Sequence, residues 1–379
     1  MSGRGTAAAC AGEPIHAGMP PLDMDGRALS RFEFWPTWIV YLPVALQWLW
    51  LSLRYGGVTL PTLANPLMEA GGLCGESKTE VLRQLGPEGR RWLAPFASVV
   101  TAPPGTPAAT DLAAALDAAA RAGLAFPLVA KPDISCQGTG VRVVDGPDAL
   151  AAYLAAFPRG ARVILQQLVP ESGEAGIFYV RRPDEAKGRI ISLTLKYFPH
   201  VVGDGRSTVE ELIRRDRRAG RIPDLYLKRL AAEQRRRVLA AGEPFRLAFV
   251  GNHCKGAIFR DGRAYITEAM TDRIDRIARE VPEFYFGRFD VRFRTIEDLR
   301  GGERFRIIEY NGAGSEATHI WDRDTRLLDA WRTLLGHGRL AFEIGARNRV
   351  RGFRPTTPMT LLRLWRNEKR LMRLYPVGQ

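Results

Sequence analysis

Two segments of the sequence place acidic and amide side chains where they could act together. In the alternating segment FGRFDVRFR, Arg288 and Asp290 share one face. In the segment RFRIIEYN that follows, Glu309 and Asn311 share one face. If the two strands are antiparallel neighbours, these side chains converge, and their oxygens suit a Mg²⁺ ion that also holds nucleotide phosphates. Arg288 could then neutralise a transferring phosphoryl group. The alternative is an exposed sheet face with ordinary pairs between arginine and carboxylate groups.

A lysine and several glycines form a second candidate site. Lys131 follows an apolar run, and the loop Asp133–Gly140 (DISCQGTG) comes directly after it. Glycines let backbone N–H groups approach phosphate oxygens closely, and the lysine supplies a positive charge. Because the loop leads into a strand and lacks the GxxxxGK[ST] pattern, it is not a Walker P-loop. We predict a hairpin that folds over a triphosphate, and a plain turn is the alternative.

Alternating helices and strands must position these residues. Apolar runs and alternating segments predict strands, and periodic segments with capping residues predict helices. The predicted strands are residues 126–130, 141–144, 162–169, 176–182, 189–198, 245–250, 287–294 and 304–310, and the predicted helices are residues 77–85, 110–122, 147–157, 209–217 and 224–241.

Length and charge exclude several classes of protein. The chain has 379 residues, of which 46% are hydrophobic and 25% charged, so it is neither disordered nor fibrous. A net charge of +14 suits phosphate, nucleic acid or an anionic membrane surface. The four cysteines form no CxxC pair, which argues against a disulfide framework or zinc site and makes a reducing cytoplasm the default.

The N-terminal region contains a long uncharged stretch. Residues 1–30 are predicted to be a loose tail without a secretory signal. The apolar segment 31–74 follows, and within it residues 35–53 carry four of the eight tryptophans. Three interpretations are open for this stretch: a membrane-interfacial segment, a helix or hairpin buried in the protein's own core, and a transmembrane helix. Pro43 and Gln47 lie in the middle of this stretch and disfavour a transmembrane helix.

Residues 346–379 are predicted to form a basic amphipathic tail. Within Thr360–Tyr375 (TLLRLWRNEKRLMRLY), leucine and tryptophan are interleaved with arginine and lysine. Two interpretations are equally open. The segment is a helix lying on anionic lipid or on a partner, or it is a terminal helix docked on its own domain with a solvated arginine face.

The ordered set of motifs resembles the ATP-grasp superfamily, particularly carboxylate–amine ligases of the D-alanine–D-alanine ligase and cyanophycin-synthetase kind. The motifs are VAKP, SCQGTGV, QQLVPESGE, LKYF, VVGDGRSTVEELI, RFD and IIEYNGAGS, and they cover about residues 75–345. The resemblance implies an α+β protein with the ATP-grasp fold, in which two lobes with antiparallel sheets clasp ATP. The N-terminal lobe would be residues 75–170, and the C-terminal lobe with the Mg-ATP site residues 171–345.

The resemblance also implies roles for individual residues. Lys196 would reach the γ-phosphate, and Arg288 would stabilise the acyl-phosphate step. Lys78 and Lys131 would contact the nucleotide, and Glu174 would hold the ribose hydroxyls. The loop over the phosphates would be Ser135, Gln137, Gly138, Thr139 and Gly140, the hinge that reads adenine would be Gln167, Leu168 and Val169, and the ligands of Mg²⁺ (with Mn²⁺ as an alternative) would be Asp290, Glu309 and Asn311.

The implied reaction joins a carboxylate to an amine. The carboxylate attacks the γ-phosphate of ATP to give an acyl phosphate and ADP, and an amine then displaces phosphate to form an amide. The implied partners are small-molecule carboxylate and amine substrates, with an anionic membrane surface as a further candidate. The expected location is the cytoplasm, with a peripheral position on the inner face of the membrane as an alternative.

Two other functions compete with the ligase. A membrane-associated ATP-grasp phosphotransferase would stop at phosphoryl transfer. A basic nucleic-acid-binding protein would explain the charge and the arginines of residues 229–237. No interleaved aromatic stacking motif accompanies those arginines, so no nucleic-acid partner is expected.

Overall fold

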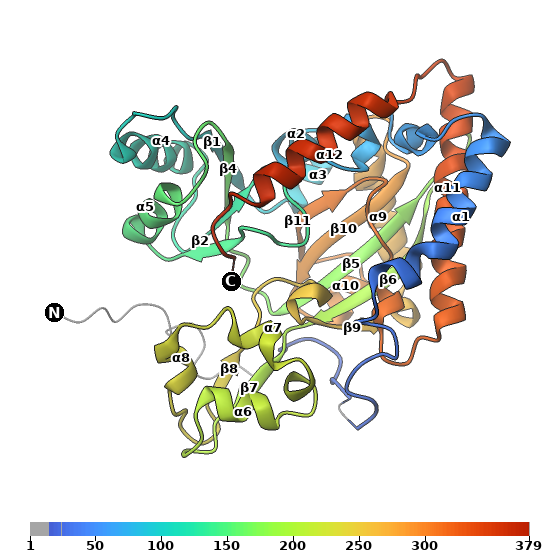
Figure 1. Cartoon of the computed structure of the whole chain (residues 1–379). Coiled ribbons are helices and arrows are strands. Elements are labelled where there is room, and N and C mark those ends of the chain that lie inside the picture. Colours follow the sequence, from blue (N-terminus) through green and yellow to red (C-terminus); the bar gives the residue numbers. More distant parts are fainter. Residues whose placement is uncertain (1–14, 24, 379) are drawn as a thin grey trace.

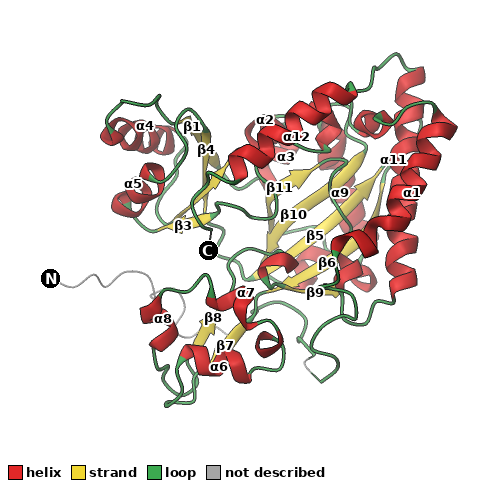
Figure 2. Cartoon of the chain, in the orientation of Figure 1, coloured by secondary structure: helices red, strands yellow, loops and turns green. Residues whose placement is uncertain are grey.

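The computed structural model describes residues 15–23 and 25–378 (Figure 1). Three sheets are present among these residues, with strand orders β1-β4-β2-β3, β11-β10-β5-β6-β9 and β7-β8. Every pairing between these strands is antiparallel. Helices flank both larger sheets, as Figure 2 shows. The predicted α+β class with antiparallel sheets is confirmed.

The four-stranded sheet belongs to the first lobe. Since side chains of a strand alternate between its faces, Leu128 and Ala130 pack under two helices, whereas Val129 and Lys131 point to the other face and line a cavity. The elements of this lobe are β1 (Phe96–Val100), α4 (Ala108–Arg121), β2 (Leu128–Pro132), β3 (Arg142–Val144), α5 (Pro147–Ala155) and β4 (Arg162–Gln167).

The five-stranded sheet forms the second lobe. Its strands are β5 (Gly173–Val180), β6 (Arg189–Tyr197), β9 (Ile258–Asp261), β10 (Phe286–Phe293) and β11 (Phe305–Asn311). One face packs against α2 (Lys78–Arg83), α3 (Pro87–Trp92), α9 (Glu268–Glu280) and α10 (Ile296–Arg300), and the other face packs partly against α11 (Leu327–Val350). On β10, Phe289 and Val291 point into the core between this sheet and the helices α2, α3, α9 and α10. Arg288 and Asp290 therefore point to the opposite face.

A small module lies below the second lobe in Figure 1. It comprises β7 (His200–Val202), α6 (Val209–Arg215), α7 (Pro223–Leu227), α8 (Ala232–Arg236) and β8 (Pro244–Arg246) around its own core. The prediction of one helix over residues 224–241 is wrong. Ala231 is extended between α7 and α8, and the chain then turns back so that Val238 bridges Thr208, which places Leu239 in the module core.

The tryptophan-rich stretch forms one helix, α1 (Thr37–Tyr55), which packs along α11. The ring of Trp48 meets that of Phe342 at 5.1 Å, and Trp331 donates from its indole N–H to the Val40 carbonyl. The opposite face of α1 is exposed, with Leu53 84% and Trp38 69% accessible. Across the described part of the chain, no helix combines the length and apolarity needed to cross a bilayer.

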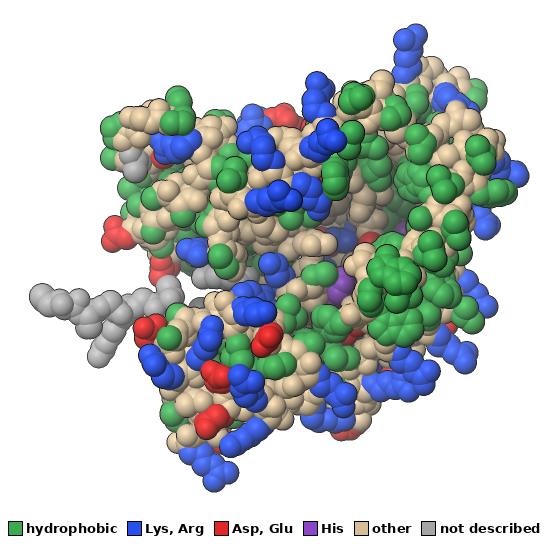
Figure 3. Space-filling view, viewed as in Figure 1, with side chains coloured by type: hydrophobic (Ala, Val, Ile, Leu, Met, Phe, Trp, Pro, Cys, Tyr) green, Lys and Arg blue, Asp and Glu red, His purple; other side chains and the backbone are tan. Residues whose placement is uncertain are grey.

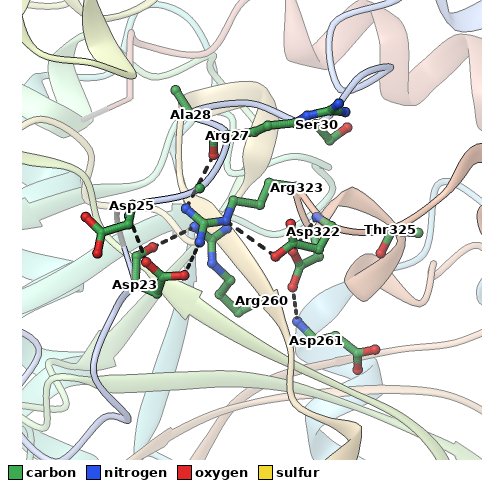
Figure 4. Close-up of polar contacts among 12 residues, drawn as sticks. Asp23, Asp25, Arg27, Ala28, Ser30, Arg260, Asp261, Asp322, Arg323 and Thr325 are labelled. Carbon is green, nitrogen blue, oxygen red and sulfur yellow. Dashed lines mark hydrogen bonds and ion pairs between the residues drawn. The ribbon is translucent and has the colours of Figure 1, made fainter.

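The residues before α1 are held by ion pairs. Arg323 pairs with Asp23 and donates to the Arg27 carbonyl, while the Asp261 backbone N–H donates to Asp322 (Figure 4). Thus part of the predicted tail 1–30 lies against the edge of the second sheet. Residues 1–14 of that prediction lie outside the described residues.

The basic segment at the C-terminal end forms α12 (Pro358–Met372), which lies across both lobes (Figure 1). Glu368 accepts a hydrogen bond from the Gly75 backbone at 2.7 Å. Beyond the helix, Tyr375 stacks on Phe157 at 5.1 Å and donates to the Ile134 carbonyl. The segment is therefore docked on its own chain, while its arginines are exposed.

Candidate active site

A cavity of about 690 Å³ lies between the two larger sheets. Its walls come from β2 and β4 of the first lobe, from β6, β10 and β11 of the second, and from α1, α11 and α12. The predicted residues that line it are Lys78, Lys131, Ser135, Gln137, Gly138, Gln167, Leu168, Val169, Glu174, Lys196, Arg288, Asp290, Glu309 and Asn311. Thr139 and Gly140 belong to the same loop but not to the lining.

Strand register brings the predicted oxygen ligands together. β10 and β11 are antiparallel neighbours, as predicted, with Asp290 opposite Glu309 and Arg288 opposite Asn311. A β-bulge follows Asp290, so the pairing shifts by one residue beyond this point. Two carboxylates and an amide therefore lie side by side on the cavity face of the sheet.

Asp290 is enclosed by positive charge. Arg288 donates to both of its oxygens, at 2.8 and 2.9 Å, and Lys196 Nζ donates to Oδ1 at 2.9 Å. Burial by itself would raise the pKa of Asp290, but Arg288 and Lys196 hold it far below its usual range. The carboxylate is consequently ionised at neutral pH, which is the form that a metal ion binds.

Glu309 is balanced by Lys78. The Lys78 Nζ lies 3.2 Å from Glu309 Oε1 and donates to the Ser135 carbonyl at 2.5 Å. Burial opposes ionisation of Glu309, yet the charges of Lys78 and Lys131 lower its pKa. The first turn of α2 positions Lys78, because Asp133 accepts from the Ser77 hydroxyl and the Thr79 backbone N–H, both at 2.7 Å.

Lys131 has a different environment. Its Nζ donates to Gln166 Oε1 at 2.8 Å and to the Ile308 carbonyl at 3.0 Å, and both acceptors are neutral. Burial lowers the pKa of Lys131 to about 8, and the attraction of Glu309 offsets this only in part. An anionic ligand beside Lys131 would restore its full charge.

Glu174 is a buried and fully paired carboxylate. Its two oxygens accept from Lys196 at 3.3 Å and from Arg292 at 3.0 Å. Lys196 thus joins Glu174 to Asp290 across the sheet. Arg292 lies on the same face of β10 as Arg288, and by its contact with Glu174 it fixes that carboxylate at the cavity.

The glycine-containing loop approaches the second lobe closely. Gln137 and Gly138 both have left-handed backbone, with φ of 56° and 68°. A Cβ atom on Gly138 would lie 2.4 Å from Val250 Cγ1, so this position requires glycine. The loop therefore closes one end of the cavity.

The predicted hinge also lines the cavity, but the side chain of Gln167 is already engaged. It accepts from the Ala125 N–H and donates to the Ala125 carbonyl, both at 3.1 Å. The Gln167 backbone N–H donates to the Pro95 carbonyl at 2.8 Å. Leu168 and Val169 follow at the end of β4.

The donor set fits a hard cation. The described residues contain no group of three or more His, Cys, Asp or Glu side chains that could hold a metal ion. Asp290 and Glu309 with the amide oxygen of Asn311 form a different set, made only of oxygen donors. Two ionised carboxylates facing one cavity suit Mg²⁺, which takes few protein ligands besides phosphate oxygens and water.

Several lining residues were not found from the sequence. Glu316 follows the Asn311 motif, Tyr41 comes from α1, and Trp365 and Glu368 come from α12. The motif IIEYNGAGS ends one residue before Glu316, and this proximity is the signal in the sequence that could have pointed to it. Tyr41 and Trp365 lie in segments whose patterns concerned only apolarity and charge.

No model of a protein family and no curated protein matches the chain. Similar solved structures include a bifunctional glutathione synthetase from Pasteurella multocida (18% identity, TM-score 0.33). The VanG D-Ala:D-Ser ligase from Enterococcus faecalis has 13% identity and a TM-score of 0.38, and the D-alanine–D-alanine ligase from Bacillus anthracis has 12% and 0.40. All are synthetases or ligases.

These similarities cover 68%, 72% and 75% of this chain. The chain spans 35% of the length of the glutathione synthetase, 64% of the D-Ala:D-Ser ligase and 72% of the D-alanine–D-alanine ligase. The names agree with the resemblance predicted from the sequence motifs. Every one of these TM-scores is below 0.5.

Proposed function

We propose that the chain is an ATP-grasp ligase that activates a carboxylate as an acyl phosphate and joins it to an amine. The observation that supports this most is the pairing of Asp290 with Glu309 across β10 and β11, inside a cavity that also holds Lys78, Lys131 and Lys196. Lysines that lie beside ionised carboxylates on the wall of a cavity provide charges of both signs for a metal–polyphosphate complex.

The nucleotide would lie between the sheets. In this proposal Lys78 and Lys131 contact its phosphates under the loop of Ser135, Gln137, Gly138, Thr139 and Gly140. Leu168 and Val169 offer backbone groups to adenine, since the polar groups of the Gln167 side chain are bound to Ala125. Glu174 would turn from Lys196 to the ribose hydroxyls, and Lys196, still paired with Asp290, would reach the γ-phosphate.

The chemistry requires charge neutralisation and alignment more than a nucleophile from the protein. The substrate carboxylate forms a bond to the γ-phosphorus while the bond to ADP breaks, and Arg288 stabilises the charge on the transferred group. The amine nitrogen then attacks the acyl carbon, phosphate departs with the bonding electrons, and the amine loses a proton. Mg²⁺ (or Mn²⁺) held by Asp290, Glu309 and Asn311 would supply further positive charge to the phosphates.

Thermal unfolding with and without MgATP tests the nucleotide site. At about 100 times its dissociation constant, MgATP adds about 2.7 kcal/mol to the free energy of unfolding. We expect wild type to show this shift only when Mg²⁺ is present, and Asp290→Asn to lose it. Asp117→Asn, on the exposed surface of α4, is the matched control. An equal shift in Asp290→Asn would reject the metal assignment.

Product analysis separates the ligase from the phosphotransferase. The ligase releases ADP and phosphate and forms an amide only when acid and amine are both supplied. A stable phosphorylated product without amide would favour the phosphotransferase instead. An affinity for nucleic acid that falls steeply as the salt concentration rises would support a basic nucleic-acid-binding protein instead.

We also propose an anionic membrane surface as a partner. The exposed face of α1 carries Trp38, Leu42, Leu46, Leu49 and Leu53, all at least half exposed. Figure 3 shows hydrophobic side chains over α1, and lysine or arginine side chains over α12, on the same face of the molecule. An apolar stripe next to cations is the composition expected of a surface that binds anionic lipid.

A further inference from the structure

One end of the cavity differs in chemistry from the phosphate end. There, α1 and α11 form an apolar wall together with aromatic side chains of the second sheet. The side chains of this wall are Val44, Trp48, Phe259, Phe286, Leu334 and Ala341. Polyphosphate gains nothing from such a surface, whereas the hydrocarbon part of a substrate does.

Glu316 lines the same cavity and lies next to the site of phosphoryl transfer. Its backbone carbonyl accepts from Arg288 at 3.0 Å, which fixes the residue beside the Asp290–Arg288 pair. Its carboxylate accepts from the Tyr41 hydroxyl and, at 2.6 Å, from the Trp321 indole N–H. Both donors are neutral, in contrast to the lysine and arginine donors that pair with Asp290, Glu309 and Glu174.

The charge of Glu316 is therefore not fully compensated. Burial raises the pKa of Glu316, and the hydrogen bonds from Tyr41 and Trp321 and the more distant charge of Arg288 offset this only in part. Two histidines also line the cavity, but burial lowers the pKa of His253 to about 4 and that of His337 to about 3. Both are neutral at pH 7, so neither supplies the missing cation.

We propose that Glu316, held by Tyr41 and Trp321, binds the ammonium group of the acceptor substrate, and that the wall between α1 and α11 binds its hydrocarbon part. The acceptor is accordingly a primary amine with an apolar body. This inference rests on the proposed ligase function and names its acceptor class. It also explains why α1 is packed here: the helix supplies Tyr41 to the carboxylate and Val44 and Trp48 to the wall.

Binding of n-alkylamines in the absence of ATP tests the inference directly. With isothermal titration calorimetry we expect hexylamine to bind more tightly than butylamine, by about fourfold for each added methylene. 1-Hexanol, which has the same alkyl chain and no charge, should bind at least tenfold more weakly than hexylamine. Glu316→Gln keeps the shape of the side chain and should weaken hexylamine binding at least tenfold.

A second pair of variants tests the wall. Val44→Trp fills the apolar end and should abolish the dependence on alkyl length, whereas Leu46→Trp places the same side chain on the exposed face of α1 and should leave it unchanged. Circular dichroism would detect misfolding of Glu316→Gln. In that case the comparison of Val44→Trp with Leu46→Trp still tests the inference.

Each outcome decides one of the two proposals. Equal hexylamine affinity in wild type and Glu316→Gln, or binding of 1-hexanol that is as tight as that of hexylamine, overturns the acceptor site. If MgATP does not shift the thermal unfolding of the wild-type protein, the ligase function is overturned. The amine titrations contain no nucleotide, so their result does not depend on this outcome. In an assay with ATP and a carboxylic acid, formation of an N-hexyl amide supports both.

Discussion

Lys131 combines burial with neutral hydrogen-bond acceptors, and its charge is therefore sensitive to pH. A lysine whose pKa is about 8 in the ligand-free protein is protonated below this pH and increasingly neutral above it. Phosphate oxygens bind the protonated form. If Lys131 contacts ATP as proposed, ATP binding is linked to uptake of a proton by this side chain at alkaline pH.

We predict that the dissociation constant of MgATP is constant between pH 6.5 and 7.5 and then rises, approaching tenfold per pH unit above about pH 8. Calorimetry in two buffers of different ionisation enthalpy would measure the proton uptake. Lys131→Arg stays charged and should flatten the profile. A wild-type profile that is flat to pH 9.5 would contradict the role of Lys131.

At the scale of elements, the residues before α1 tie the small module to the second lobe. Arg218 donates to both oxygens of Glu33, at 2.5 and 3.2 Å, and both side chains are almost completely buried. Removing one partner of a buried pair leaves an uncompensated charge, which costs more than removing both.

Glu33→Gln should therefore lower the free energy of unfolding by about 3–5 kcal/mol, as measured by urea denaturation. The double variant Glu33→Gln with Arg218→Met removes both charges and should recover most of this loss. If the single and double variants are equally destabilised, the pair does not behave as a charge pair.

α12 and the residues after it connect the first lobe to the cavity. Tyr375 packs in the core of the first lobe, and its hydroxyl binds the Ile134 carbonyl, next to the loop over the proposed phosphate site. If this loop binds nucleotide as proposed, we expect stability and nucleotide binding to be coupled through this side chain.

We predict that Tyr375→Ala destabilises the protein by about 3 kcal/mol and raises the KM for ATP, because the contacts beside Ser135 are lost. Tyr375→Phe removes only the hydrogen bond and should cost about 1 kcal/mol. Urea denaturation and initial rates measure the two effects. A KM for ATP that is unchanged in Tyr375→Ala would separate the C-terminal segment from the nucleotide site.

At the scale of the whole molecule, α1 has two distinct faces. One packs on α11 and lines the cavity, and the other exposes the apolar stripe described above. Membrane binding through that stripe would therefore place the apolar end of the cavity close to the bilayer, which is the phase where an amine with a hydrocarbon body concentrates.

We expect the protein to float with vesicles that contain anionic lipid and to be released by high salt, because part of the attraction comes from exposed arginines and lysines. Leu46→Glu combined with Leu53→Glu should reduce the bound fraction at least tenfold. Val202→Glu, on the small module, is the control. Failure to float with any vesicle, or equal flotation with neutral lipid alone, would contradict the proposal.

The local pattern of the sequence was sufficient for part of the candidate site. Successive side chains of a strand point to opposite faces of the sheet. This rule alone places Arg288 and Asp290 on one face of β10, and Glu309 and Asn311 on one face of β11. The position of Lys131 ahead of a glycine-containing loop is likewise a local feature. For these residues, the sequence pattern predicted which side chains share a face and that Lys131 lies beside the loop, and the structure places all of them on the wall of the cavity.

Contacts between distant segments were decided only by the tertiary structure. Tyr41 and Glu316 are 275 positions apart, and Tyr375 and Ile134 are 241 apart. Hydrophobicity shows that α1 and α12 must bury one face, but many partners can satisfy that requirement. Which face is buried, and which side chains then enter the cavity, depends on the packing of the whole chain, since burial is non-directional and takes its geometry from every surrounding element.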